Sequence, residues 1–140
     1  MKKILVLIAI IAAIFTVSSC EKATEDSWKA TVETLDPTNV TFESACLNAK
    51  ITWSCTKKHL CEVGILYNTE PGVKYYTPGV ISIRKDNISQ QEGVMELHET
   101  IKHLESTPDT YYYVAYFRIF IGPEEKFIYG KEVSYKVPGK

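Results

Sequence analysis

The stretch PDTYYYVAYFRIF, residues 108–120, decides the fold, because it places six aromatic residues within thirteen positions. Aromatic side chains favour β-strands, and successive side chains along a strand point to opposite faces. Counted from Tyr112, this alternation puts Tyr116 on the core side and Tyr113 on the opposite side. Arg118 then falls on the core side, where we expect a bulge or the end of the sheet to release it. The stretch therefore predicts a strand with aromatic side chains on both faces.

The chain around this stretch consists of short β-like runs separated by turn residues, without a sustained 3.6-residue period. Residues 44–53 alternate most clearly, with Ala45, Leu47, Ala49, Ile51 and Trp53 on one face. We expect strands at residues 28–35, 44–53, 62–68, 80–84, 94–104, 110–120 and 127–137. Seven short strands with no helix between them predict an all-β protein, a two-sheet antiparallel sandwich.

The beginning of the chain has the anatomy of a signal peptide. Lys2 and Lys3 precede an uncharged run of fourteen residues, 4–17, which is shorter than the about 20 residues that span a bilayer as a helix. Residues 17–20, Val-Ser-Ser-Cys, resemble the lipobox of bacterial lipoproteins, which implies cleavage before Cys20 and lipidation of its thiol. An ordinary secretory signal with an unmodified Cys20 is the alternative.

Three parts of the chain follow from these observations. We expect a lipoprotein signal peptide at 1–19, a lipid-anchored tether at 20–27 and the β-sandwich at 28–140. Acyl chains contribute about 0.8 kcal/mol per buried methylene, so two or three of them hold a small domain at a membrane without a spanning helix.

Four segments within residues 28–140 carry a resemblance to a known family. They are SACLNA at 44–49, EVGILYNT at 62–69, PDTYYYV at 108–114 and YGKEVSY at 129–135. In this order they resemble the fibronectin type III-like domains of surface lipoproteins of Bacteroidota. The resemblance implies a seven-stranded antiparallel sandwich of the immunoglobulin or fibronectin type III kind, used as a spacer or binding module. Sandwiches of this kind carry a corner tyrosine near the start of the sixth strand, and here Tyr112 matches that position.

The side of the 110–120 strand opposite the expected core is the candidate binding face. Flanking strands extend it, so that it comprises Tyr111, Tyr113, Phe117, Ile119, Leu66 and Ile128. A contiguous apolar strip is uncommon on a monomer surface, which points to docking of a protein or, through aromatic stacking, of a glycan. The alternatives are that a loop such as residues 73–79 folds over the strip, or that these are ordinary residue choices for an exposed strand.

Cysteine and histidine spacing predicts no metal site. Cys55 and Cys61 are close enough in the chain for a disulfide that would contribute roughly 2 kcal/mol, and free thiols are the alternative. His59 between them does not complete the four-ligand spacing of structural zinc. Because His98 and His103 fall on opposite faces of a regular strand, they cannot share a metal. We expect no cofactor and no catalytic activity.

Charge excludes nucleic acid as an expected partner. The chain has 16 basic and 17 acidic residues, and removal of Lys2 and Lys3 with the signal leaves 14 against 17. Phosphate binding requires clustered basic side chains, which are not found here. We therefore expect a non-catalytic module that is lipid-anchored at the bacterial outer membrane, surface-exposed or facing the periplasm, and that binds a protein or polysaccharide. The alternatives are a structural spacer, an accessory subunit of an envelope complex, or a periplasm-facing inhibitor or immunity lipoprotein.

Overall fold

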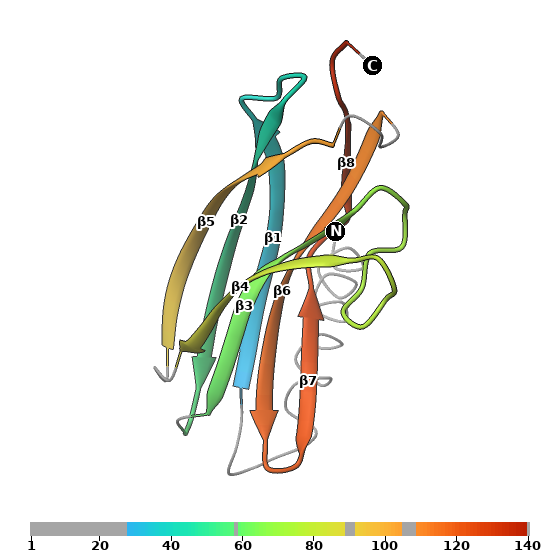
Figure 1. Ribbon diagram of the computed structural model, residues 1–140. Helices are drawn as coiled ribbons and strands as arrows, with labels where there is room; N and C mark the ends of the chain where they lie inside the picture. The colour runs from blue at the N-terminus through green and yellow to red at the C-terminus, as the bar shows by residue number, and fades with distance from the viewer. Residues whose placement is uncertain (1–27, 58, 89–91, 105–108, 140) are drawn as a thin grey trace, which may run out of the picture.

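Two antiparallel sheets face each other in the computed structural model, which describes residues 28–57, 59–88, 92–104 and 109–139 (Figure 1). The strands in these ranges are β1 (Trp28–Thr38), β2 (Ser44–Cys55), β3 (Leu60–Asn68), β4 (Ile81–Ile88), β5 (Glu92–Lys102), β6 (Thr110–Ile121), β7 (Glu124–Tyr129) and β8 (Val133–Lys136). The signal peptide and tether predicted at 1–27, with Cys20, lie outside the described residues.

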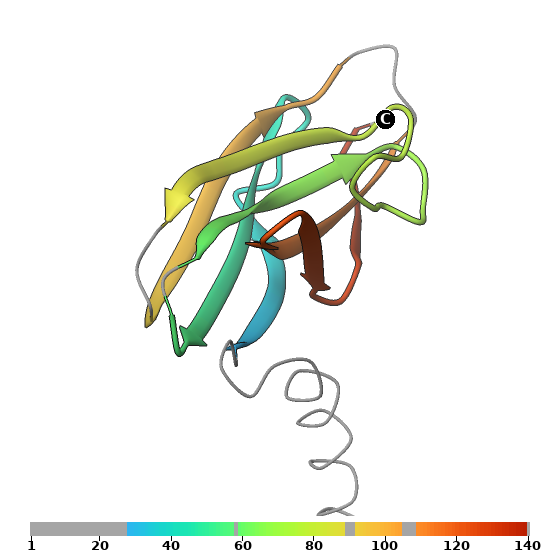
Figure 2. The ribbon, with the colours of Figure 1, turned by 90° about the horizontal axis from the view of Figure 1, so that it is seen from below.

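The strand order defines a sandwich. One sheet has the order β1-β2-β5, and the other has the order β4-β3-β6-β7, with β8 also paired to β6. Each pairing is antiparallel. Figures 1 and 2 show the two layers from two directions. The prediction of an all-β, two-sheet antiparallel sandwich is confirmed.

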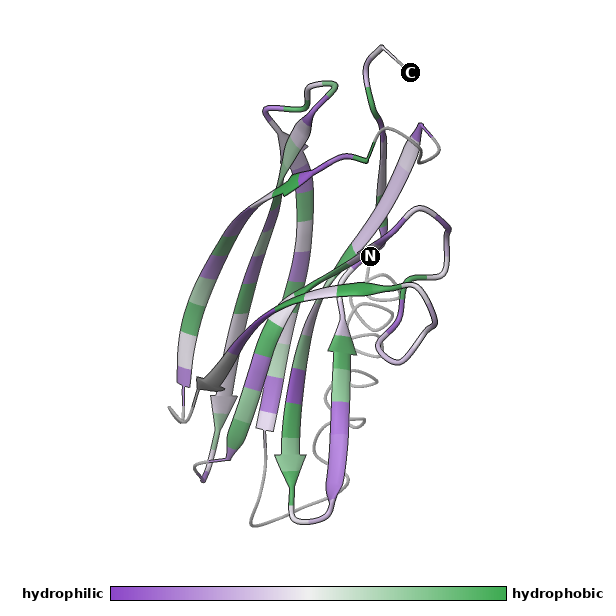
Figure 3. Cartoon of the chain, viewed as in Figure 1, coloured by the Kyte–Doolittle hydropathy of each residue, from purple (hydrophilic) through white to green (hydrophobic). Residues whose placement is uncertain are grey.

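Alternation of apolar and polar residues builds the three-stranded sheet (Figure 3). The five alternating residues predicted for one face of β2 all point into the core, with exposures of 0–3%: Ala45, Leu47, Ala49, Ile51 and Trp53. Between them, Lys50 and Thr52 are exposed on the outer face. This half-buried strand is therefore where the predicted pattern and the structure agree in detail.

The described residues form eight strands rather than the predicted seven, because the expected strand at 127–137 is divided into β7 and β8. Gly130 lies at the division, and its N–H donates to the carbonyl of Ala115 at 2.9 Å. A Cβ atom on Gly130 would lie 3.0 Å from the backbone nitrogen of Thr34 and 3.1 Å from the carbonyl oxygen of Val32. The backbone of β1 therefore approaches so closely here that only glycine fits, and the strand is interrupted.

The direction of the side chains of β6 is the reverse of the predicted one. Tyr111, Tyr113, Phe117 and Ile119, expected on the outside, lie between the sheets with exposures of 0–3%. Tyr113 is accommodated there because its hydroxyl donates to the carbonyl of Leu35. The prediction counted the alternation from Tyr112 as a core residue, whereas Tyr111 is the core residue. A shift of one residue in the register moves every side chain of a strand to the opposite face.

The corner tyrosine shows the same shift by one residue. The backbone N–H of Leu104 donates to the hydroxyl of Tyr111 at 3.2 Å, so Tyr111 and not Tyr112 has the role that the sequence suggested. The ring of Tyr111 also packs against His103, with ring centroids 4.8 Å apart, and stacks on Tyr135 at 5.7 Å. Tyr112 is half-buried and packs on the other face of the sheet. These partners fix the register of β6.

A matched pair of substitutions tests this register. We expect Tyr111→Phe to lower the free energy of unfolding by about 1 kcal/mol, because the N–H of Leu104 loses its acceptor. Tyr112→Phe should change it by less than about 0.5 kcal/mol. Chemical denaturation of both variants measures the difference, and a larger loss for Tyr112→Phe would contradict the assignment.

Candidate functional site

A loop covers the outer face of the five-stranded sheet, the face directed away from the other sheet. We call residues 71–80 the strap. Val73 in the strap is 2% exposed and packs with the outward-facing Leu66, Val114 and Tyr116 in a second apolar cluster. The alternative that a loop such as 73–79 folds over this sheet is therefore what the structure shows, with the opposite register of β6 beneath it.

Side chains from the C-terminal part of the sheet hold the strap in place. The backbone N–H groups of Gly72 and Val73 both donate to Glu132 Oε1, at 3.0 and 2.7 Å. The N–H of Tyr75 donates to the hydroxyl of Tyr129 at 3.2 Å, and Lys74 Nζ lies 4.1 Å from the centre of the Tyr129 ring. The strap is thus fixed through its backbone, which leaves the side chains of Tyr75 and Tyr76 available for other contacts.

Cross-strand pairing places an acid, a base and an aromatic ring in one row beneath the strap. Glu62 of β3 pairs with Arg118 of β6, which pairs with Phe127 of β7. In the next row Gly64 pairs with Tyr116. A Cβ atom on Gly64 would lie 2.8 Å from the Tyr116 ring, so the absence of a side chain lets the ring lie across β3. The Tyr116 hydroxyl consequently reaches Glu62 and donates to its carboxylate.

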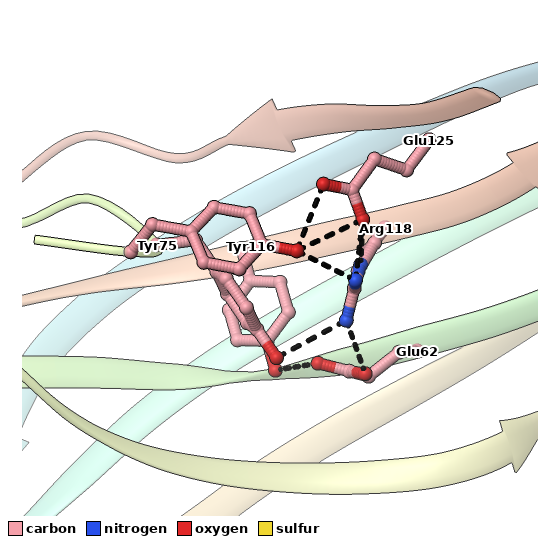
Figure 4. Close-up of polar contacts among 6 residues, drawn as sticks. Glu62, Tyr75, Tyr116, Arg118 and Glu125 are labelled. Atoms are coloured by element: carbon pink, nitrogen blue, oxygen red, sulfur yellow. Dashed lines mark hydrogen bonds and ion pairs between the residues drawn. The ribbon is translucent and has the colours of Figure 1, made fainter.

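Arg118 is the centre of this cluster (Figure 4). Its Nη1 donates to Glu62 Oε1 and to the Tyr75 hydroxyl, both at 3.1 Å. Its Nη2 donates to the Tyr76 hydroxyl at 2.9 Å and also to Glu125, and its Nε donates to Glu125 Oε2 at 3.0 Å. These five bonds match the five N–H donors of a guanidinium. We call Glu62, Tyr75, Tyr76, Tyr116, Arg118 and Glu125 the arginine network.

Aromatic rings surround the same guanidinium. Arg118 Cζ lies 4.4 Å from the ring centre of Phe120, 4.8 Å from that of Tyr75 and 5.5 Å from that of Phe127. These distances are typical of cation–π contacts. Because Arg118 points outward, it needs neither the bulge nor the escape from the sheet that the sequence suggested. The charge is accommodated by an aromatic shell and two carboxylates.

The network shifts the pKa values of its members in the directions that strengthen it. Burial opposes the charge of Arg118, but its hydrogen bond to Glu125 and the nearby carboxylates outweigh burial and raise its pKa. Hydrogen bonds from Arg118 and Tyr76 lower the pKa of Glu125. Burial, followed by the hydrogen bond to Glu62, raises the pKa of Tyr116. These pKa shifts favour the charged forms of Arg118 and Glu125 and the neutral form of Tyr116.

Tyr76 is the exposed member of the network. Tyr76 is 70% exposed, while its hydroxyl donates to the two Glu125 carboxylate oxygens, at distances of 2.9 and 3.1 Å. Its backbone φ angle is 67°, in the left-handed region that bulky residues rarely adopt. The ring of Tyr75 meets it edge-on at 4.7 Å. An aromatic ring is thus held toward solvent in one orientation by a strained backbone.

The residues predicted as a binding face do not form one. Tyr111, Tyr113, Phe117 and Ile119 are in the main core, and Leu66 is 1% exposed in the second cluster. Ile128 is half-buried and packs against the main core. The expected exposed strip at these six positions is therefore corrected: they supply packing between the layers and beneath the strap.

The cysteines and histidines considered as disulfide partners or metal ligands lie at three separate places in the described residues. Cys55 and Cys61 are free, buried thiols at the β2–β3 corner, whereas His98 bonds to Asn48 at 2.7 Å and His103 to the Tyr135 hydroxyl at 2.9 Å. Among the residues that the structure describes, no cluster of three or more His, Cys, Asp or Glu side chains is arranged for a metal ion. The same residues include no helix with the length and apolar character needed to cross a bilayer.

Charged residues inside apolar strands were the available sequence signal for the arginine network. Glu62 follows Leu60-Cys61 and precedes Val63, and Arg118 lies within Tyr-Phe-Arg-Ile-Phe, residues 116–120. A charge in such a context usually has a partner, because an unpaired buried charge is costly. The partner could not be assigned without the β3–β6 register. Tyr76 carried no comparable signal.

Comparisons with known proteins find distant structural similarity and no family. No protein-family model matches the chain, and no curated protein matches its sequence. Among solved structures, the chain is similar to the sensor domain of the anti-sigma factor RsgI4 of Pseudobacteroides cellulosolvens in its long form, with a TM-score of 0.49, 19% identity, and coverage of 78% of this chain and 89% of that one. The solution structure of the same sensor domain gives a TM-score of 0.44 and 18% identity, with coverage of 78% and 75%.

Removal of the central charge should destabilise the fold strongly. We expect Arg118→Met to lower the free energy of unfolding by about 3 kcal/mol, because Glu62 then remains buried without its counter-ion. Adding Glu62→Gln should recover part of this loss, since a neutral amide still accepts the Tyr116 hydroxyl.

Lys126→Ala provides the surface control for this experiment. Lys126 is half-buried and forms an ion pair with the exposed Glu124 at 3.2 Å on the same sheet, and solvent-accessible pairs of this kind contribute less than about 1 kcal/mol. Urea unfolding of the four proteins measures the set. Equal losses for Arg118→Met and Lys126→Ala would contradict the central role of Arg118.

Acid should weaken the network through Glu125. The pKa of this carboxyl is lower in the folded protein than its ordinary value of 4.5. Its contribution to stability is therefore fully present above about pH 4.5 and is lost as the pH falls through the lower, folded value. We expect the difference in melting temperature between the native chain and Glu125→Gln to be constant from pH 7 to about pH 5 and to shrink below that. A difference that grows in acid would reverse the assigned sign.

Proposed function

We propose that the chain is a non-catalytic binding module of the bacterial envelope, which holds a protein or polysaccharide partner through the exposed ring of Tyr76. The observation that carries this proposal is an aromatic side chain with 70% exposure on a backbone with φ of 67°. A bulky residue in this conformation persists only where its surroundings impose it, and such positions concentrate at functional sites.

Pre-organisation supports a binding role for this ring. The hydroxyl of Tyr76 accepts from Arg118 and donates to Glu125, so the side chain does not lose further freedom when a partner contacts it. Tyrosine supplies a large, rigid contact area with few rotatable bonds, and it is enriched among residues that dominate binding energy. Stacking on a sugar ring or packing in a protein pocket both use the face of such a side chain.

The same bonds argue against catalysis by the network. Each N–H donor of Arg118 is used within the protein, and the Tyr116 hydroxyl is used by Glu62. General acid or base catalysis requires a group that can exchange a proton with a substrate. The titratable groups of the network instead orient one another.

Attachment to the envelope belongs to the same proposal. Lipidation of Cys20 would anchor the chain at the outer membrane, either exposed at the surface or facing the periplasm. A tether at 20–27 has a maximum reach of about 28 Å when fully extended. The fold begins at once after it, because Trp28 is 8% exposed and stacks on Phe117 with ring centroids 6.1 Å apart. The domain is thereby kept close to the membrane.

We further propose that the sandwich is fibronectin type III-like. The β1-β2-β5 order facing β4-β3-β6-β7, together with the Tyr111 corner, supports this assignment. Domains of this kind serve mainly as binding modules and spacers, so the fold is compatible with the proposed role and does not by itself select a partner.

Substitution of Tyr76 tests the binding role. We expect Tyr76→Ala to weaken binding at least tenfold, whereas Tyr76→Phe should weaken it less, because the ring remains. Phe42→Ala is the matched control, since Phe42 is an exposed aromatic residue (46%) in the β1–β2 loop. The measurements are binding of the lipidated chain to an array of bacterial surface polysaccharides and to solubilised envelope proteins. Equal losses for Tyr76→Ala and Phe42→Ala would reject the site, and the absence of binding by the native chain would favour a spacer.

A further inference from the structure

The β2–β3 corner brings two thiols together between the sheets. Cys55 is the last residue of β2 in the three-stranded sheet, and Cys61 is the second residue of β3 in the five-stranded sheet. Both point into the main core, with exposures of 7% and 1%. The corner between them spans only residues 56–60, so the two sulfur atoms belong to one short connection between the layers.

The two thiols are neighbours in this corner. Burial raises the pKa of the Cys61 thiol and the nearby Cys55 raises it further, and Cys61 Sγ donates to the carbonyl of His59 at 3.5 Å. A disulfide forms between cysteines whose Cβ atoms lie about 3.5–4.5 Å apart, and here both side chains enter the same core from one short connection. The third described cysteine, Cys46, contacts Asn48 Oδ1 at 3.4 Å instead and is half-buried.

We propose that Cys55 and Cys61 are an oxidation site, which a thiol–disulfide oxidoreductase of the exported compartment converts into a disulfide that links the two sheets. The structure then represents the reduced form of this site. The proposal goes beyond ligand binding by Tyr76 and requires only that the chain is exported to a compartment in which disulfides persist.

The thiol–disulfide exchange needs no reactant besides the oxidoreductase disulfide. The thiolate of Cys55 attacks the disulfide of the oxidoreductase, which forms a mixed disulfide and expels one enzyme thiolate. The thiolate of Cys61 then attacks Cys55 Sγ, which forms the internal bond and releases the second enzyme thiolate. Two electrons pass to the oxidoreductase, whose disulfide becomes a dithiol, and the protons of the two cysteines pass to its thiolates through solvent.

Burial determines when this reaction takes place. Burial raises the pKa of Cys61 to about 12, with further contributions from Cys55, and burial also raises the pKa of Cys55. Because the thiolate is the attacking species, the folded corner reacts slowly at neutral pH. Oxidation therefore belongs to folding after export, before β2 and β3 close over the thiols, and the finished bond is shielded from reductants.

Peptide mapping tests the proposal. The full-length chain is produced in a Gram-negative host that exports it, and it is alkylated with iodoacetamide in denaturant without reductant. Trypsin cleaves between the two cysteines at Lys57, which separates residues 51–57 from 59–74, while Cys46 lies in residues 30–50. We expect peptides 51–57 and 59–74 to be recovered as one cross-linked species that reductant separates, with Cys46 alkylated. Alkylation of both Cys55 and Cys61 in the exported chain would overturn the proposal, as would a bond from either one to Cys46.

Thermal unfolding gives an independent readout. Because the fold shields the bond, the exported chain is treated with reductant in denaturant and refolded in its presence before melting. This treatment should lower the melting temperature of the native chain by about 10 °C, since it opens a ring of seven residues, 55–61. The Cys55→Ala/Cys61→Ala double variant should not respond to reductant, and Cys46→Ala should respond as the native chain does. A native chain whose melting temperature is unaffected by reductant would also count against the bond. Because none of these measurements involves Tyr76, their outcome is independent of the proposed binding role.

Discussion

The guanidinium of Arg118 is the constraint on which the outer half of the structure depends. A charge at 12% side-chain exposure is stable only if its donors are satisfied, and here five hydrogen bonds satisfy them while four aromatic rings surround the guanidinium. Two of these bonds go to the strap, through the hydroxyls of Tyr75 and Tyr76. The strap therefore has one arrangement that completes the network. Since replacing a buried ion pair by apolar residues often costs no stability, we infer that the role of this pair is to fix one arrangement of the strap.

Coverage by the strap also explains why aromatic residues concentrate in β6. This strand has two apolar faces to fill, because Tyr113 and Phe117 pack between the sheets while Tyr116 packs beneath the strap. Only a strand buried on both sides requires large side chains at consecutive positions. The Tyr113 and Tyr116 hydroxyls each reach an acceptor, on β1 and β3 respectively, so burial leaves neither of them unsatisfied.

The contrast between β2 and β6 shows what the sequence can predict. In β2, polar residues such as Lys50 alternate with apolar ones, so the period of two identifies the buried face directly. In β6, both faces are apolar, so the pattern predicts a strand but cannot tell which face meets the other sheet. The predicted register of the whole strand therefore depended on whether Tyr111 or Tyr112 was assigned as the first core residue. Likewise, the pairing of Glu62 with Arg118 and the left-handed backbone of Tyr76 are set by tertiary contacts that no local pattern reports.

The exposed ring of Tyr76 is the part of the network that internal packing accounts for least. Its hydroxyl bonds to Arg118 and Glu125 and its ring meets Tyr75 edge-on at 4.7 Å, yet the residue remains 70% exposed on a left-handed backbone. A residue selected for packing alone would bury its ring, as Tyr116 does at 0% exposure in the same network. The orientation of Tyr76 thus has a cost in the free protein that the bonds of Arg118 offset. That cost is explained if the ring is held ready for contact with another molecule.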